Sequence, residues 1–272
     1  MLVDKKRLEE RLIEEALREW ARLRLVRVDE QPLYYGEARA DAAVVRPLSM
    51  YRALYSAAVY ESSGAFTVNS SETIVYSGDK ALAYSRLASH GIPIPRTLYA
   101  STPTAALKVE ADETLVLKPP IGSWGRLVSR ARNKDELEHQ AVMRSLLPCA
   151  TQRNTIIQEY IPNGGYDVRC IYIGGEVIGC IKRYKPAGEW RTNVALGGRV
   201  EKLPLNGELE ELTIKTAEAV KGFFVSIDIL ESKKGLLVNE VNGVPEFKGF
   251  LKATGKNPAI IISEKLKNGL RK

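Results

Sequence analysis

The chain has 272 residues, of which 44% are hydrophobic and 27% are charged, and its formal net charge at pH 7 is +7. This composition is that of a globular protein with a sizeable core. No stretch approaches the roughly 20 apolar residues of a membrane helix, which argues against a membrane protein. Basic residues are spread along the chain without interleaved aromatic residues, so we expect no nucleic acid partner. Their excess fits acidic small molecules, phosphates or an acidic protein partner, or a charged surface without a partner.

The three cysteines, Cys149, Cys170 and Cys180, have no metal-ligand spacing, and their odd number argues against a disulfide framework. A charged helical pattern follows the first three residues, from which we expect no signal peptide. We therefore expect a cytoplasmic protein.

The first part of the chain alternates between helix and strand patterns. Apolar residues recur at helical spacing over residues 6–24, and a second helix is predicted over 51–62. Strands are predicted at 25–28, 42–45 and 65–68, and this β-α-β-α-β order predicts a small parallel sheet. Gly78-Asp79-Lys80 begins another helix that Gly91 ends, so the first predicted domain is 1–91.

Residues 92–97 are rich in proline and indicate an extended linker into a second domain, 92–160. We predict its strands at 114–118, 126–129 and 155–160 and its helix at 134–147. A third domain, 161–272, is predicted to contain a hairpin of strands 167–173 and 176–183, a helix at 207–220, and a second hairpin that includes 225–230 and 236–242. The predicted fold class is α/β (α+β).

Polar residues gather on the second hairpin. Its tight turn places Asp228 on one strand beside Glu240 and Asn242 on the other, and the last two share a face because they are two residues apart. Two carboxylates and an amide supply the oxygen ligands that suit Mg²⁺ bound together with nucleotide phosphates. The alternative is a half-exposed hairpin with a polar outer side.

Lys118 ends an apolar strand and is followed by the glycine-bearing loop Gly122-Ser123-Trp124-Gly125. The glycines let backbone N–H groups approach anionic oxygens, while the lysine supplies a positive charge. The pattern indicates a phosphate-binding loop, although an ordinary hairpin turn gives the same pattern. It matches neither of the two common glycine-rich nucleotide motifs.

The strand that ends at Gln158-Glu159-Tyr160-Ile161 precedes a proline and two glycines, which is typical of a hinge between lobes. Backbone groups at a hinge can bind an adenine edge, and Asp167 or Glu159 can accept ribose hydroxyls. Lys182-Arg183 and Arg191-Thr192-Asn193 supply the cations and the amide that phosphoryl transfer requires. Solvated hairpin edges that discourage aggregation are the alternative explanation for these arginines.

Taken in chain order, these residues resemble the ATP-grasp superfamily, and within it the RimK-type ligases and most closely the LysX/ArgX family. The resemblance covers essentially the whole chain, including Arg46-x-x-Ser49-x-Tyr51-Arg52 and Asn239-Glu240-Val241-Asn242. It implies an ATP-grasp fold, in which an N-terminal α/β domain precedes two lobes that clamp ATP. The N-terminal domain would then recognise substrates and not ATP.

The resemblance also implies a role for each matching residue. The phosphates of ATP would be contacted by Lys80, Lys118 and the loop Gly122-Ser123-Trp124-Gly125, adenine by the backbone of Glu159, Tyr160 and Ile161, and ribose by Asp167. The metal ligands would be Asp228, Glu240 and Asn242. Arg183 and Asn193 would face the γ-phosphate and the activated carboxyl. The substrates would be contacted by Arg46, Tyr51, Arg169, Arg191, Gly249 and Phe250.

The reaction implied by the resemblance is carboxylate–amine ligation with ATP and Mg²⁺. The C-terminal glutamate of the acidic carrier protein LysW becomes an acylphosphate, and the amino group of glutamate or α-aminoadipate displaces phosphate. Gly249-Phe250 resembles the corresponding pair in the glutamate-using members. A bulky phenylalanine would shorten the acceptor pocket by about one methylene, which is the difference between the two acids. We therefore predict a glutamate ligase of arginine biosynthesis. One methylene is worth only about 1–3 kcal/mol, which leaves both acceptors open.

Other functions remain open at this stage. They are the same ligation of α-aminoadipate for lysine biosynthesis, a RimK-like ligase that adds glutamate to a protein tail, and a regulatory module that binds nucleotide without turnover. Because members of the family are commonly dimers or tetramers, a homo-oligomer is expected.

Overall fold

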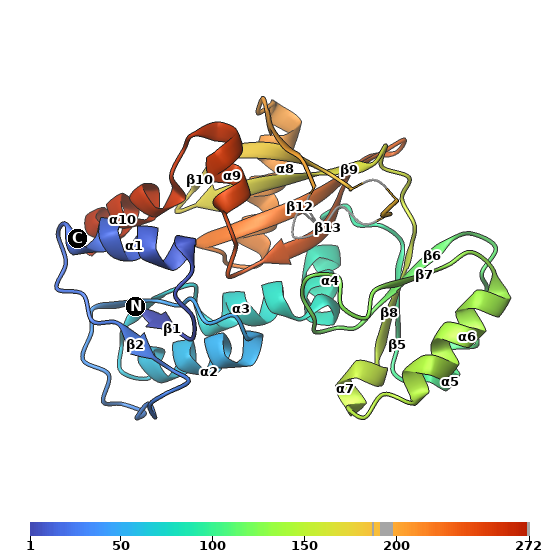
Figure 1. The fold of residues 1–272 in the computed structure, drawn as a ribbon, viewed down its shortest axis with the longest axis horizontal. Helices are drawn as coiled ribbons and strands as arrows, with labels where there is room; N and C mark the ends of the chain where they lie inside the picture. Colours follow the sequence, from blue (N-terminus) through green and yellow to red (C-terminus); the bar gives the residue numbers. More distant parts are fainter. Residues whose placement is uncertain (187, 191–197, 271–272) are drawn as a thin grey trace.

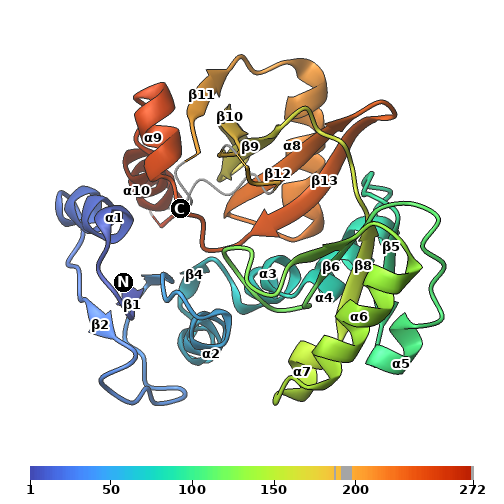
Figure 2. The ribbon, with the colours of Figure 1, turned by 45° about the vertical axis from the view of Figure 1, so that its right-hand side comes forward.

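The computed structural model of the chain describes residues 1–186, 188–190 and 198–270. The strands fall into three groups, each with its own helices (Figures 1 and 2). Within the described part of the chain, no helix is long and apolar enough to cross a membrane.

The first group is a small parallel sheet, which confirms the prediction from the alternation of strands and helices. β1 pairs with β2 and β3 pairs with β4, both in parallel, and a bridge from Leu2 to Val45 joins the two pairs. The sheet packs on α2 and α3 through Ala53, Ala57 and Ile74. Its elements are β1 (Leu2–Val3), β2 (Val26–Arg27), β3 (Ala42–Val44), α2 (Met50–Glu61), β4 (Phe66–Val68) and α3 (Ser71–Gly78). Helix α3 was not predicted.

The second group is a four-stranded antiparallel sheet in the order β5-β8-β6-β7. The predicted strand at 126–129 is wrong. β7 begins only at Ser129, because Leu127, inside the predicted strand, has a left-handed φ angle of 57°. The elements are α4 (Lys80–Ser89), which leads into it, then β5 (Thr97–Ala100), α5 (Pro103–Ala106), β6 (Leu115–Lys118), β7 (Ser129–Ala131), α6 (Lys134–Ser145), α7 (Ala150–Arg153) and β8 (Thr155–Glu159).

The third group is a five-stranded antiparallel sheet in the order β11-β10-β9-β12-β13. One face packs on α8, and the other packs on α9, α10 and the N-terminal helix α1. The elements are β9 (Tyr166–Ile173), β10 (Glu176–Tyr184), β11 (Val200–Leu203), α8 (Gly207–Ala219), β12 (Phe224–Ser232), β13 (Gly235–Asn242), α9 (Lys248–Thr254), α10 (Pro258–Gly269) and α1 (Leu8–Arg18). The first and last helices therefore lie side by side (Figure 1).

A disulfide joins Cys170 of β9 to Cys180 of β10, so the expectation drawn from the odd number of cysteines is wrong. Parity argues against a framework that pairs every cysteine, but it does not exclude one bond. A regular hairpin around Gly174-Gly175 would place Gly179 opposite Cys170. A β-bulge shifts the register by one residue, and Cys180 becomes the partner.

Asn69 fastens the end of β4 to the five-stranded sheet. Its Nδ2 donates to the carbonyl oxygens of Phe224 and Gly243, and its Oδ1 accepts from the backbone N–H groups of Phe223 and Phe224. Gly243 lies so close to α3 that a Cβ there would stand 2.1 Å from Ser77 Oγ. The small parallel sheet therefore fixes the loop that follows β13.

Candidate active site

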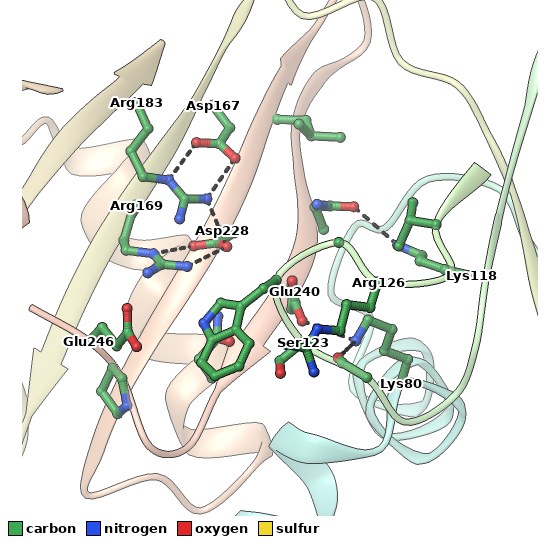
Figure 3. Close-up of a pocket in the computed structure, with 18 of the residues that line it drawn as sticks. Lys80, Lys118, Ser123, Arg126, Asp167, Arg169, Arg183, Asp228, Glu240 and Glu246 are labelled. Atoms are coloured by element: carbon green, nitrogen blue, oxygen red, sulfur yellow. Dashed lines mark hydrogen bonds and ion pairs between the residues drawn. The ribbon is translucent and has the colours of Figure 1, made fainter. Parts of the chain in front are cut away.

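The four-stranded and five-stranded sheets, with Arg7 and Leu48 of the N-terminal part, line a cavity of about 330 Å³ (Figure 3). Two lysines line it on one side, next to the loop that follows β6. Arginine and aspartate side chains of the five-stranded sheet line it on the other side. The cavity therefore presents cationic groups from separate parts of the chain, which is the arrangement expected around a polyanion.

Lys118, at the end of β6, is buried with uncharged hydrogen-bond partners. Its Nζ donates to Tyr84 Oη at 2.7 Å, to Gln158 Oε1 at 2.8 Å and to Asn239 Oδ1 at 3.3 Å. Burial lowers the pKa of Lys118, and the charge of Lys80 lowers it further, to about 7, against the opposing effect of Glu240. An anion bound here would restore its full charge.

Lys80 is the first residue of α4. The side chain of Asp79 caps this helix by accepting from the N–H groups of Ala81 and Leu82. Lys80 Nζ lies 3.1 Å from Glu240 Oε1 and donates to the carbonyl oxygen of Gly122 at 2.9 Å. Burial alone would lower the pKa of Lys80, but the charge and hydrogen bond of Glu240 outweigh burial and raise it. Lys80 therefore links the metal-ligand candidate to the glycine loop.

The glycine loop is pinned at its base and exposed at its tip. The backbone N–H of Lys80 donates to the carbonyl oxygen of Pro120 at 2.8 Å. Trp124 is 45% exposed, and the Arg126 guanidinium lies 5.2 Å from its ring centre. Figure 3 shows Ser123 and Arg126 beside Lys80. The loop thus lies where its backbone could contact phosphates.

The segment after β8 forms another part of the wall. Glu159 is tied to Arg96 through both its backbone N–H and its carboxylate, which accepts from the Arg96 N–H at 2.8 Å. The Tyr160 ring lies 5.5 Å from the guanidinium of Arg130, which also lies 5.4 Å from the Trp190 ring. Arg130 belongs to β7, so this stack connects the four-stranded sheet to the region after β10.

Two arginines and two aspartates form a continuous ladder across β10, β9 and β12. Arg183 donates to both oxygens of Asp167 at 2.7 and 2.6 Å and lies 2.8 Å from Asp228. Arg169 donates to both oxygens of Asp228 at 2.7 and 2.8 Å. Burial opposes ionisation of Asp228, but the two guanidinium groups outweigh it and hold its pKa well below the usual range. Asp228 is therefore ionised at neutral pH.

The metal-ligand candidates lie on neighbouring strands. Asp228 is the register partner of Glu240, and Asn242 lies two residues farther along β13. The Asn242 Nδ2 is buried without a hydrogen-bond partner. Among the described residues, no group of three His, Cys, Asp or Glu side chains could hold a metal ion. Two carboxylates with an amide oxygen still fit Mg²⁺, whose remaining ligands are commonly water and phosphate oxygens.

Residues 77–266 match the RimK-like ATP-grasp domain. The chain belongs to the RimK-like ATP-grasp family. Among its relatives, the glutamate–LysW ligase ArgX of Sulfurisphaera tokodaii is 46% identical over 278 residues, which cover 100% of this chain and 99% of that protein. The α-aminoadipate–LysW ligase LysX of the same organism is 32% identical over 235 residues, which cover 85% of this chain and 82% of LysX.

Among solved structures, the ATP-grasp ligase PsnB complexed with minimal precursor, Mg and ADP is similar to this chain with a TM-score of 0.75. The two sequences are 18% identical, and the match covers 99% of this chain and 96% of the PsnB chain. The likeness confirms the predicted ATP-grasp fold. The division into domains at residues 91 and 160 stays a prediction.

Most of the residues predicted for the ATP-grasp site meet in the cavity. It is lined by Lys80, Lys118, Gly122, Ser123, Trp124, Gly125, Glu159, Tyr160, Ile161, Asp167, Arg169, Arg183, Asp228, Glu240, Asn242, Gly249 and Phe250. Their individual roles stay predictions. Arg191 and Asn193 lie outside the described residues.

Two predicted substrate residues do not line the cavity. Arg46 is 1% exposed and bonds to the carboxylate of Glu10 and the carbonyl oxygen of Pro245. Tyr51 lies on the exposed side of α2, with its ring stacked on Tyr55. Arg46 therefore stands behind the wall of the cavity.

The structure adds residues that the sequence reasoning did not single out. Tyr84 lies one helical turn after Lys80, a spacing that could have indicated a shared face. Arg7 and Glu246 both line the cavity and bond to each other across 239 positions of the chain. No local pattern could have indicated that contact.

Proposed function

We propose that this chain is an ATP-dependent ligase that joins the C-terminal glutamate of LysW to the amino group of glutamate, as a step of arginine biosynthesis. The observation that carries the proposal is the 46% identity, over the whole of both chains, to a glutamate–LysW ligase. The cavity supports it, because paired cations on two sides suit a reaction in which two anions must approach each other.

In the proposed complex, the phosphates of ATP lie against Lys80, Lys118 and the glycine loop, and adenine meets the backbone at Tyr160 and Ile161. Asp228, Glu240 and Asn242 would hold Mg²⁺, which neutralises charge on phosphate oxygens when it is bound. Both oxygens of Asp167 accept from Arg183, and both oxygens of Asp228 accept from Arg169, so ribose at Asp167 or Mg²⁺ at Asp228 would replace one of these hydrogen bonds.

The chemistry takes two steps. A carboxylate oxygen of the carrier attacks the γ-phosphorus of ATP, the bond to the bridging oxygen breaks, and ADP leaves behind an acylphosphate. The free amine of the acceptor then attacks the acyl carbon, phosphate leaves, a proton is lost and the amide forms. Lys118, Arg169 and Arg183 offset the negative charge that gathers in the first step. The glycine loop would shield the acylphosphate from water.

The second candidate is the same reaction with α-aminoadipate as the acceptor. A LysX enzyme is 32% identical over 85% of this chain, which supports this candidate less strongly than the glutamate ligase. Phe250 lines the cavity, and its bulk suits the shorter acid.

The test is ADP release by the purified protein with ATP, Mg²⁺ and LysW, with glutamate or α-aminoadipate as the acceptor. Mass spectrometry of the carrier would identify the product. Turnover with glutamate supports the proposal, and turnover with α-aminoadipate alone favours the second candidate. ATP binding without turnover on either acceptor would contradict both and favour a ligase for another protein tail or a regulatory module.

A further inference from the structure

One wall of the cavity is formed by the start of α1 and the loop after β13. Here Arg7 Nη1 donates to Glu246 Oε1 at 2.5 Å. The Arg7 side chain is 22% exposed and the Glu246 side chain is 29% exposed, and both line the cavity. A positive and a negative group therefore face the same space one hydrogen bond apart.

A buried network holds this pair in place. Arg7 Nε and Nη2 donate to the two carboxylate oxygens of Glu10 at 3.0 and 2.9 Å, and the Glu10 side chain is fully buried. Behind it, Arg46 donates to Glu10 and to the carbonyl oxygen of Pro245, the residue before Glu246. The guanidinium and the carboxylate are thus oriented before any ligand arrives.

The loop itself is anchored from the same helix. The carboxylate of Glu9 accepts from the backbone N–H groups of Phe247 and Lys248 at 3.2 and 3.1 Å. Glu246 stands just before these anchored residues and four residues after Asn242. Figure 3 shows Glu246 near Arg169 and across the cavity from Lys80 and Lys118. The pair therefore lies away from the lysines proposed to bind phosphate.

We propose that Arg7 and Glu246 form the subsite for the head group of the acceptor amino acid, in which Arg7 binds the α-carboxylate and Glu246 binds the α-ammonium. This inference rests on the proposed function. A free α-amino acid carries both charges on one carbon, and a neighbouring guanidinium and carboxylate complement both. Without an acceptor the two side chains neutralise each other, so neither charge is left unpaired.

The inference separates recognition of the head group from recognition of chain length. Glutamate and α-aminoadipate share the head group and differ by one methylene in the side chain. A substitution at Arg7 or Glu246 should therefore weaken the binding of both acceptors by the same factor. Any selection between them belongs to residues elsewhere in the cavity.

The experiment compares Arg7→Gln and Glu246→Gln with the unaltered protein and with Arg11→Gln as a matched control. Arg11 lies on the exposed side of α1, so its variant makes the same change of side chain on the same helix. Initial rates of ADP release give KM for the acceptor, ATP and LysW. We expect KM for glutamate to rise roughly 10- to 100-fold in both cavity variants, with KM for ATP unchanged.

Two analogues test the assignment of each charge. 4-Aminobutyrate lacks the α-carboxylate of glutamate, so its inhibition constant should be unchanged by Arg7→Gln. Glutarate lacks the amino group, so its inhibition constant should be unchanged by Glu246→Gln. A residue with a purely structural role would weaken glutamate and both analogues together. Melting temperatures and ADP affinity identify variants that are merely misfolded. Arg7→Lys keeps the positive charge and serves as the conservative variant.

The outcomes distinguish this inference from the proposed function. If the unaltered protein turns over with glutamate and KM for glutamate changes less than about threefold in both variants, the subsite is overturned while the function stands. Equal weakening of glutamate and both analogues overturns it as well. If the unaltered protein shows no turnover with any acceptor, the proposed function fails and the subsite fails with it.

Discussion

Lys118 and Tyr84 form a buried pair in which the lysine Nζ donates to the phenol oxygen at 2.7 Å, and Tyr84 in turn donates to the carbonyl oxygen of Asn239 at 2.6 Å. The lysine thus sits in a polar but uncharged setting, which disfavours its protonated form. No carboxylate bonds to its Nζ among the described residues, although Glu240 lies near enough to raise its pKa partly.

This setting predicts that ATP binding takes up a proton. The pKa of Lys118 is about 7 in the free protein, and bound phosphate raises it. Below pH 7 the lysine is already charged, whereas above pH 7 it must gain a proton on binding. The affinity for ATP should therefore fall as pH rises from 7 to 9, by up to about tenfold per unit. Titration calorimetry in buffers with different ionisation enthalpies measures this uptake.

Lys118→Arg is the control, because arginine keeps its proton throughout this range. Its ATP affinity should vary less with pH than that of the unaltered protein. Equal proton uptake in both proteins would show that another group titrates and would contradict the role given to Lys118.

Glu240→Gln should abolish ligation and leave the fold intact. The side chain is 30% exposed and its contact with Lys80 is at the cavity surface, so little stability depends on it. Loss of one anionic ligand and of the partner of Lys80 should lower kcat by roughly 100-fold or more. ADP release with Mg²⁺ as the only metal measures the effect, and the exposed Glu208→Gln is the matched control. Normal turnover in Glu240→Gln would contradict the assignment of Glu240 as a ligand of Mg²⁺.

Phe250→Leu should shift acceptor preference toward α-aminoadipate. Phe250 lines the cavity, but it is only 1% exposed and packs in the core that α9 shares with the five-stranded sheet. Phe250→Ala would cost about 3–5 kcal/mol of stability, so leucine is the better probe. The ratio of kcat/KM for the two acceptors should change by roughly tenfold.

Phe247→Leu provides the matched control for that prediction. Phe247 belongs to the same core and is fully buried, but it does not line the cavity. It should lower stability without changing the acceptor ratio. An equal ratio in both variants would remove Phe250 from acceptor selection.

Asp167→Asn should destabilise the protein more than it affects nucleotide binding. Its carboxylate accepts two hydrogen bonds from the buried Arg183, and the substitution leaves that guanidinium with Asp228 as its remaining anionic partner among the described residues. Breaking a buried pair of this kind costs roughly 3–5 kcal/mol. Urea unfolding measures the loss, with the exposed Asp112→Asn as a control. A small loss together with equal affinity for ATP and 2′-deoxy-ATP would instead favour the ribose role.

The sequence predicted best what depends on position along a strand or at the start of a helix. Glu240 and Asn242 share a face because strand residues alternate. The turn alone would pair Asp228 with Asn239, and a β-bulge next to Asp228 makes Glu240 its partner. Lys80 follows a capping aspartate, which marks the beginning of α4. The order of these individually weak signals along the chain then indicated the family. The comparisons confirmed the family and the fold.

The predictions failed where structure depends on a distant or irregular feature. A β-bulge places Cys180 opposite Cys170, and no residue type in the sequence predicts that bulge. Arg46 matched a substrate motif, yet tertiary packing turned it away from the cavity toward Glu10. The contact of Arg7 with Glu246 depends on how the two ends of the chain come together.

The packing of α1 against α10, together with the hydrogen bonds of Asn69 at the end of β4, has a consequence for how this chain can be divided. The segment that matches the family begins at residue 77, yet Arg7, Asn69 and the Glu9 anchor of the loop after β13 all precede it. A fragment cut at residue 77 would keep both lysines and the arginine ladder but lose one side of its reaction chamber. Such a fragment would lose the Arg7–Glu246 pair and the anchors of the loop after β13, so we expect an exchange of residues 1–76 between relatives to disturb this side of the cavity.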